Sequence, residues 1–136
     1  MIIGKPLSDA KTPRLIEYSL DDQWTVLVGR TEKDNDTLSL KVAKSNDWWF
    51  HIRGMPGSHV VLKVPAGEDP SRDILKMAAS IAAFYSKART GGVVAVSCTR
   101  ARYVTKSRSA KSGTVQIRKE SVLKVRPGLG EACKEK

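Results

Sequence analysis

The sequence predicts an α+β fold: a mostly antiparallel sheet built from hairpins, with one long helix packed on it. Two observations support this prediction. Short β-prone runs separated by turn formers occupy most of the chain, and one long amphipathic stretch interrupts them. The 136 residues, 40% of them hydrophobic, match one domain with one core. We assign residues 14–127 to that domain, residues 1–13 to an amino-terminal arm and residues 128–136 to a charged tail.

The first predicted elements are a hairpin and a short helix. Residues 14–19 alternate in polarity and residues 23–28 are rich in β-formers, so they predict two strands joined by a tight turn. Asn35 or Asp36 can cap a short helix near residues 36–44. The alternation of apolar residues in that stretch fits a strand almost as well.

A second hairpin and the long helix are predicted next. Residues 48–53 and 59–64 are β-prone, and the glycines and proline of residues 54–57 favour a reversal between them. Asp69 followed by a proline is a helix-start pattern, and apolar residues then recur at three- and four-residue spacing. We predict a helix over residues 70–87 whose alanine-rich face packs flat against the sheet.

The carboxy-terminal part is predicted to return to strands and loops. Residues 93–98 form an apolar run that predicts a buried strand, and the polar residues 106–113 predict an exposed, mobile basic loop. Apolar residues on both sides of residues 119–121 predict a last hairpin. From Pro127 onward we expect a frayed tail.

The positive charge is concentrated near the carboxyl end. Residues 1–86 contain 11 Lys and Arg and 11 Asp and Glu, whereas residues 87–136 contain 13 and 3. A polarised positive field captures polyanions, so nucleic acid or an anionic membrane surface is the natural partner. No apolar run approaches the ~20 residues of a membrane span, and residues 1–11 lack the apolar core of a signal peptide. We therefore predict a cytoplasmic chain that binds nucleic acid and no membrane.

The second hairpin separates an apolar face from a chemically functional face, because side chains alternate across a strand. The functional face carries an aromatic ring beside imidazoles and cations. Its members are Asp47, Trp49, His51, Arg53, His59 and Lys63. If the hairpin turns near Met55, His51 lies opposite His59. An exposed aromatic plane beside cations can stack a base and hold its phosphate. Alternatively, Trp49 packs in the core and each histidine satisfies backbone groups.

The two histidines could also act as chemical groups. Paired imidazoles near a lysine can supply an acid and a base for phosphoryl transfer, and with Asp47 they can bind a metal. A metal needs further ligands, and the sequence has neither a phosphate-binding glycine loop nor a nucleophile elbow. We predict no catalytic site, no metal and no cofactor. The two cysteines are too few for a disulfide framework or a four-cysteine zinc site.

Several short motifs follow one another in order along the chain. They are Gly29-Arg30, Asn35-Asp36-x-Leu38, Asp47-x-Trp49-x-His51, Pro56-Gly57-Ser58-His59-Val60, Ala78-Ala79-x-x-Ala82-Ala83-x-x-Ser86, Val104-x-Lys106 and Lys111-x-Gly113-x-Val115. Over residues 15–127 this series resembles the NFACT-R domain, the carboxy-terminal domain of the NFACT proteins, which act in ribosome-associated quality control. Thr31 departs from the asparagine common in the family, and the basic loop lacks the family's proline and double lysine.

This resemblance implies an RNA-binding α+β domain whose partners are tRNA and the large ribosomal subunit. The residues that match the family signature are Arg30, Asp47, Trp49, His51, Ser58 and His59, and those that match its basic loop are Lys106 and Lys111. Full-length members carry further domains that 136 residues cannot hold. The resemblance therefore implies a free-standing form without tail-elongating activity.

We predict a non-enzymatic RNA-binding module that binds tRNA, rRNA or the ribosome in translation or ribosome quality control. Side chains of the second hairpin and the basic region would contact phosphates and bases. These are Arg30, Asp47, Trp49, His51, Arg53, Ser58, His59, Lys63, Arg100, Arg102, Lys106, Arg108 and Lys111. One alternative is a protein-interaction module with an acidic ribosomal partner, and another is a small nuclease that uses His51 and His59. DNA binding also stays open, because phosphate attraction does not distinguish the sugars.

Overall fold

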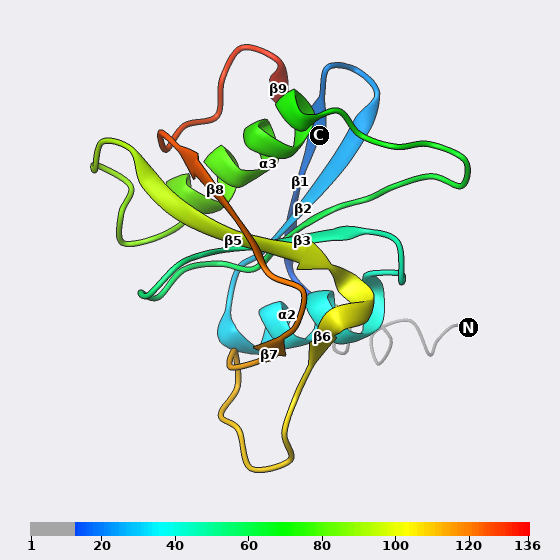
Figure 1. Cartoon of the computed structure of the whole chain (residues 1–136), viewed down its shortest axis with the longest axis vertical. Coiled ribbons are helices and arrows are strands. Elements are labelled where there is room, and N and C mark those ends of the chain that lie inside the picture. The colour runs from blue at the N-terminus through cyan, green and yellow to red at the C-terminus, as the bar shows by residue number, and fades with distance from the viewer. Residues whose placement is uncertain (1–12) are drawn as a thin grey trace, which may run out of the picture.

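A seven-stranded antiparallel sheet divides the molecule into layers in the computed structural model, which describes residues 13–136 (Figure 1). In spatial order its strands are β8 (Ser121–Val125), β5 (Val94–Arg100), β3 (Trp48–Ile52), β4 (Val60–Leu62), β2 (Trp24–Gly29), β1 (Leu15–Leu20) and β9 (Cys133–Glu135). The α+β prediction is confirmed. The predicted arm of residues 1–13 lies, except for Pro13, outside the described residues.

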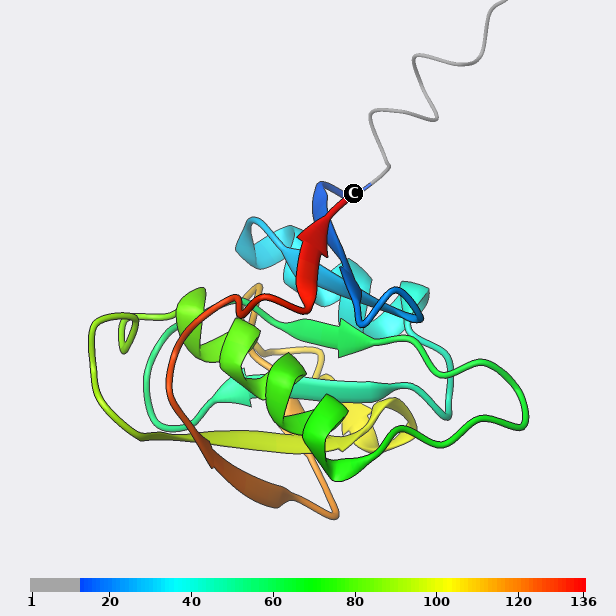
Figure 2. The ribbon, with the colours of Figure 1, turned by 90° about the horizontal axis from the view of Figure 1, so that it is seen from above.

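The long helix α3 (Arg72–Phe84) covers one face of the sheet, as Figures 1 and 2 show. Buried side chains at helical spacing, such as Ile74, Ala78 and Ile81, pack against the strands, and the alanines allow a close approach. The helix is shorter than the predicted 70–87, and Ser71 caps it in place of Asp69, its Oγ accepting the Ile74 N–H. Within residues 13–136, no helix is long and apolar enough to cross a membrane.

The opposite face of the sheet is covered by smaller elements. They are α2 (Glu32–Thr37), the π-helical turn η1 (Leu38–Val42), the 3-10 turn η2 (Ala101–Tyr103) and the small hairpin of β6 (Val104–Thr105) and β7 (Gln116–Ile117). A second apolar cluster fills this layer, with Leu38 of η1 packed on Trp49 of the sheet. The short helix predicted near residues 36–44 begins earlier, because the Thr31 hydroxyl caps it by accepting the Asp34 N–H.

Both predicted amino-terminal hairpins are confirmed. The turn between β1 and β2 has positive φ at Asp21 and Asp22, which suits the twist of a tight hairpin. In the β3–β4 hairpin, Trp49 pairs with Val61. Continued by two residues, this register puts His51 opposite His59, and their ring centroids are 5.5 Å apart. Side-chain alternation also holds, since Phe50 faces α3 and Trp49 faces η1.

Two predictions for the carboxy-terminal part are wrong. The last hairpin does not form, because β7 pairs with β6, whereas β8 pairs with β5 in the large sheet. Apolar spacing locates strands but does not select the partner of each strand. The tail is not frayed either: β9 adds itself to the edge of β1, and Figure 2 shows it lying beside that strand. Free backbone groups at a sheet edge supply the pairing site.

Candidate nucleic-acid interface

A cleft of about 900 Å³ opens on the η1 side of the second hairpin. Its walls are residues 30–32 at the start of α2, residues 56–58 of the β3–β4 turn, residues 84–87 at the end of α3, and residues 112–115, where the basic loop ends. Trp49, His51 and His59 line the space between these walls. Four segments far apart in the sequence therefore form one concave surface.

A chain of hydrogen bonds runs from the core to the wall of this cleft. The indole Nε1–H of Trp49 donates to Ser39 Oγ at 2.8 Å, and Ser39 Oγ lies 2.7 Å from His59 Nδ1. His59 Nε2 lies 3.1 Å from the carbonyl oxygen of Gly113. We call these four groups the buried relay; it links β3, η1, the start of β4 and the basic loop.

The relay determines which nitrogen of His59 carries the proton. A carbonyl oxygen only accepts, so Nε2–H donates to Gly113, and Nδ1 accepts the hydroxyl proton of Ser39. This is the neutral imidazole. Burial, and to a smaller extent the nearby His51, lower the pKa of His59 to about 4, so His59 is uncharged at neutral pH.

Gly113 holds the basic loop, residues 106–113, at the cleft. Its carbonyl accepts from His59, and its N–H donates to Asp36 Oδ1 at 3.0 Å. Gly113 has a φ of +84°, and a Cβ at this position would lie 3.1 Å from the Cβ of Glu32. Both the backbone conformation and the close contact require glycine here.

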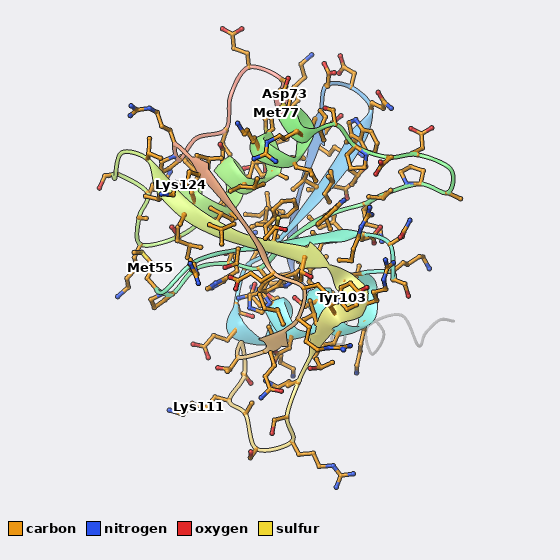
Figure 3. The ribbon with its side chains drawn as sticks, viewed as in Figure 1. Met55, Asp73, Met77, Tyr103, Lys111 and Lys124 are labelled. Carbon is orange, nitrogen blue, oxygen red and sulfur yellow. The ribbon has the colours of Figure 1, made fainter. Side chains whose placement is uncertain are left out.

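Lys106 closes the base of the basic loop. Its Nζ forms an ion pair with Asp36 Oδ2 at 3.3 Å and donates to the carbonyl oxygens of Lys111 and Thr114. Arg108 and Lys111 are exposed on the part of the loop that extends below β6 and β7 in Figure 1, and Figure 3 shows Lys111 there, apart from the sheet. Thus the predicted loop is confirmed as exposed, but Lys106 is engaged within the protein.

Three predicted site residues are buried rather than displayed on the surface. Trp49 is 3% exposed and His59 is 2% exposed, so the prediction of an open tryptophan platform is wrong. Asp47, also 2% exposed, pairs with Lys63 and accepts the Val64 N–H at 2.8 Å. The sequence shows which face these side chains share, but not that η1 and the β6–β7 hairpin cover that face.

His51 remains at the surface of the cleft. Its ring is half-buried and lies nearly parallel to the indole of Trp49, with 6.0 Å between centroids and 17° between planes. Burial lowers the pKa of His51, so its imidazole is neutral at pH 7. His51 is therefore the accessible end of an aromatic stack whose other member is buried.

The rim of the cleft is cationic. Arg30, Lys87 and Arg89 are exposed, and no ion pair forms between them and a carboxylate in the described part of the chain. The guanidinium of Arg89 lies 3.8 Å from the ring centroid of Phe84, which orients it at the end of α3. Glu32 is the one carboxylate that lines the cleft among residues 13–136.

The remaining predicted residues do not line the cleft. Arg53 lies at the hairpin turn and pairs with Glu120 at 3.6 Å. Arg100 stacks on Trp48, and Arg102 donates to Asn46, at the other end of β3. The structure therefore brings together Arg30, Trp49, His51, Ser58 and His59 and separates them from Arg53, Lys63, Arg100 and Arg102.

Sequence reasoning missed several residues that build the site. Ser39 joins two predicted site residues, and Asn35 Oδ1 accepts the His59 N–H at 3.1 Å. Asn35 approaches β2 so closely that a Cβ added to Gly29 would lie 2.0 Å from Asn35 Oδ1. This contact explains why the Gly29-Arg30 motif has a glycine. Lys87 and Arg89 belong to the basic region of residues 87–136, but the sequence does not indicate that they lie beside His51.

The arrangement does not favour acid–base chemistry by the two histidines. Both ring nitrogens of His59 are used inside the protein, so the group has no free position for a substrate proton. Between residues 13 and 136, no three His, Cys, Asp or Glu side chains are grouped to hold a metal ion.

A basic α+β domain with a cation-rimmed cleft and an exposed basic loop has the features expected of a nucleic-acid-binding domain. The sequence profile of the family described as the NFACT protein RNA binding domain matches residues 15–119. The chain belongs to this family, which confirms the resemblance seen in the sequence.

Relatives of known name agree with this assignment. The Rqc2 homolog RqcH of Bacillus subtilis is 33% identical over 133 residues, 98% of this chain and 23% of that protein. The protein of the same name from Streptococcus suis is 38% identical over 79% of this chain and 19% of its own length. The chain thus spans about a fifth of these relatives.

One solved structure has the same fold and a sequence related to that of this chain. It is the C-terminal part of the fibronectin/fibrinogen-binding protein from Streptococcus suis, with 36% identity and a TM-score of 0.79. The match covers 87% of this chain and 47% of that structure.

Proposed function

We propose that this chain is a non-enzymatic RNA-binding module that acts in ribosome quality control by binding tRNA or rRNA. Membership of the NFACT RNA-binding family and the names of the RqcH relatives support this function. The observation that carries it is the locking of the exposed basic loop against a cation-rimmed cleft through Gly113. Because Gly113 and Lys106 hold the two ends of this loop in place, binding of a polyanion costs less conformational entropy than it would for a free chain segment.

Phosphate groups are the proposed ligands of five exposed cations. These are Arg30, Lys87 and Arg89 on the rim and Arg108 and Lys111 on the loop. If all five neutralise phosphates, a plot of the logarithm of the affinity for single-stranded RNA against the logarithm of the salt concentration has a slope of about −3.5. We assign a structural role to Asp47, Lys63 and Lys106, because each forms an ion pair within the protein.

Titration of labelled tRNA and single-stranded RNA between about 50 and 200 mM salt tests this proposal. We expect the Arg108→Gln/Lys111→Gln variant to bind more weakly and with a slope shallower by about one to two units. The matched control is Lys76→Gln/Lys124→Gln, which also removes two exposed cations; Figure 3 shows Lys124 well away from Lys111. Equal losses in both variants, or an affinity that does not respond to salt, would contradict the proposed function.

A further inference from the structure

We propose that the cleft receives the base of one unpaired RNA nucleotide, which stacks on the exposed face of His51 while its flanking phosphates contact Arg30, Lys87 and Arg89. This inference rests on the proposed RNA-binding function and specifies which form of RNA the site selects. Its ligand class is a single-stranded or bulged nucleotide, not a continuous duplex.

The cleft is large enough to receive an inserted base. Its volume of about 900 Å³ falls within the range of small-ligand pockets, and its walls come from four separate segments. Bases in an A-form duplex are stacked within the helix, and side chains cannot reach their edges through the deep, narrow major groove. Only a nucleotide that has left the helix, or was never in one, can enter such a space.

The lining offers an aromatic plane to stack on. His51 is backed by the buried indole of Trp49, which holds the imidazole in place at an interplanar angle of 17°. The edge of His59 also approaches His51, at 86° between planes. His51 is thus fixed from behind by two rings and has one side toward the cleft. Unpaired bases stack on such aromatic side chains, histidine included, in many RNA sites.

Polar groups at the mouth match the rest of a nucleotide. The three exposed cations all line the cleft, so the flanking phosphates of an inserted base come within reach of them. Ser58 lines the cleft, and its hydroxyl makes no hydrogen bond with any of residues 13–136, so it can bind the edge of a base. Stacking, hydrogen bonding and charge therefore converge on one space.

The test compares three RNAs of equal length: a perfect duplex, the same duplex with one bulged nucleotide, and the bulged form with an abasic site at the bulge. We expect the wild-type chain to bind the bulged duplex about fivefold or more tightly than either of the others. In His51→Ala this preference should disappear, whereas His51→Phe, which keeps an aromatic ring, should retain it.

The outcomes separate this inference from the proposed function. If the abasic bulge binds as tightly as the intact bulge, the inserted base is disproved, even though salt-dependent RNA binding remains. If His51→Ala keeps the full preference, His51 is not the platform and the inference fails. If His51→Ala does not fold, the abasic comparison with the wild-type chain alone decides. The Arg108→Gln/Lys111→Gln variant addresses the proposed function instead. An equal loss of its affinity for all three RNAs would support the proposed function.

Discussion

His59 has both ring nitrogens hydrogen-bonded inside the protein, so its protonation opposes folding. Protonation would place a second N–H against the Ser39 hydroxyl and a charge beside His51 in a buried site. The neighbouring carboxylate of Asp36 offsets part of that cost, but burial dominates, and the pKa falls to about 4. His59 is therefore a structural group of the cleft wall, not one that titrates near neutral pH.

The free energy of unfolding should depend on pH through His59. The unfolded chain binds this proton near pH 6.5 and the folded chain near pH 4, so stability is complete above 6.5 and declines as the pH falls toward 4. The loss amounts to about 3 kcal/mol. Denaturant titrations at several pH values should show the gap between wild type and His59→Phe narrowing across this window. Parallel curves would contradict the assignment.

The backbone conformation of Gly113 positions the basic loop that is proposed to bind RNA. Gly113→Ala should cost about 1 to 3 kcal/mol of stability, because it combines a positive φ with a contact on Glu32, and it should weaken RNA binding by displacing the basic loop. Gly67→Ala is the control, since Gly67 has a φ of +80° but no atom within 4 Å of an added Cβ. Equal RNA affinity in the two variants would show that the loop tolerates the displacement.

Among the elements, the short turn η1 positions the Ser39 hydroxyl between two aromatic rings. Its π-helical turn, closed by the Ala43 N–H on the Leu38 carbonyl, buries Leu38 and Ser39 together against the sheet. Such turns often occur where a helix must aim a particular side chain. Here that side chain is the Ser39 hydroxyl, which accepts from one ring and donates to another.

Removing the Ser39 hydroxyl should destabilise the fold without touching the RNA surface. Ser39→Ala leaves the buried Trp49 N–H without an acceptor, and we expect a loss of about 1 to 3 kcal/mol in a denaturant titration. Ser45→Ala, at an exposed serine, should change stability by less than about 0.5 kcal/mol. A Ser39→Ala variant as stable as wild type would mean that the relay contributes nothing.

At the scale of the whole molecule, β9 joins the carboxyl end of the chain to its first hairpin. The Lys136 N–H donates to the Glu17 carbonyl, and β9 covers the edge of β1. Deleting residues 131–136 should lower the unfolding midpoint and increase hydrogen exchange of β1 amides, while leaving RNA affinity within about twofold.

The matched control for the deletion is Lys134→Gln/Lys136→Gln in the intact chain, which removes the same two cations but keeps the strand. If this double variant reproduces the loss of stability, then charge, rather than strand pairing, stabilises the edge. A large loss of RNA affinity in the deletion alone would place part of the interface at β9.

Much of the fold was predictable because its signals are local. The positions of most strands along the chain, the two amino-terminal hairpins, the helix over the sheet and the alternation of Phe50 and Trp49 between faces all follow from spacing within a few residues. The pairing of β8 with β5, and of β9 with β1, did not follow, since apolar patterns do not identify a partner distant in the sequence.

The sequence by itself determined that this chain is a basic α+β domain of the NFACT RNA-binding family, and that Trp49, His51 and His59 share one face. Only the tertiary structure decided that η1 and the β6–β7 hairpin cover this face, burying Trp49 and His59 and leaving His51 at a cleft. The physical reason is that alternation along a strand fixes the side on which a residue lies, whereas its exposure depends on contacts with segments remote in the chain.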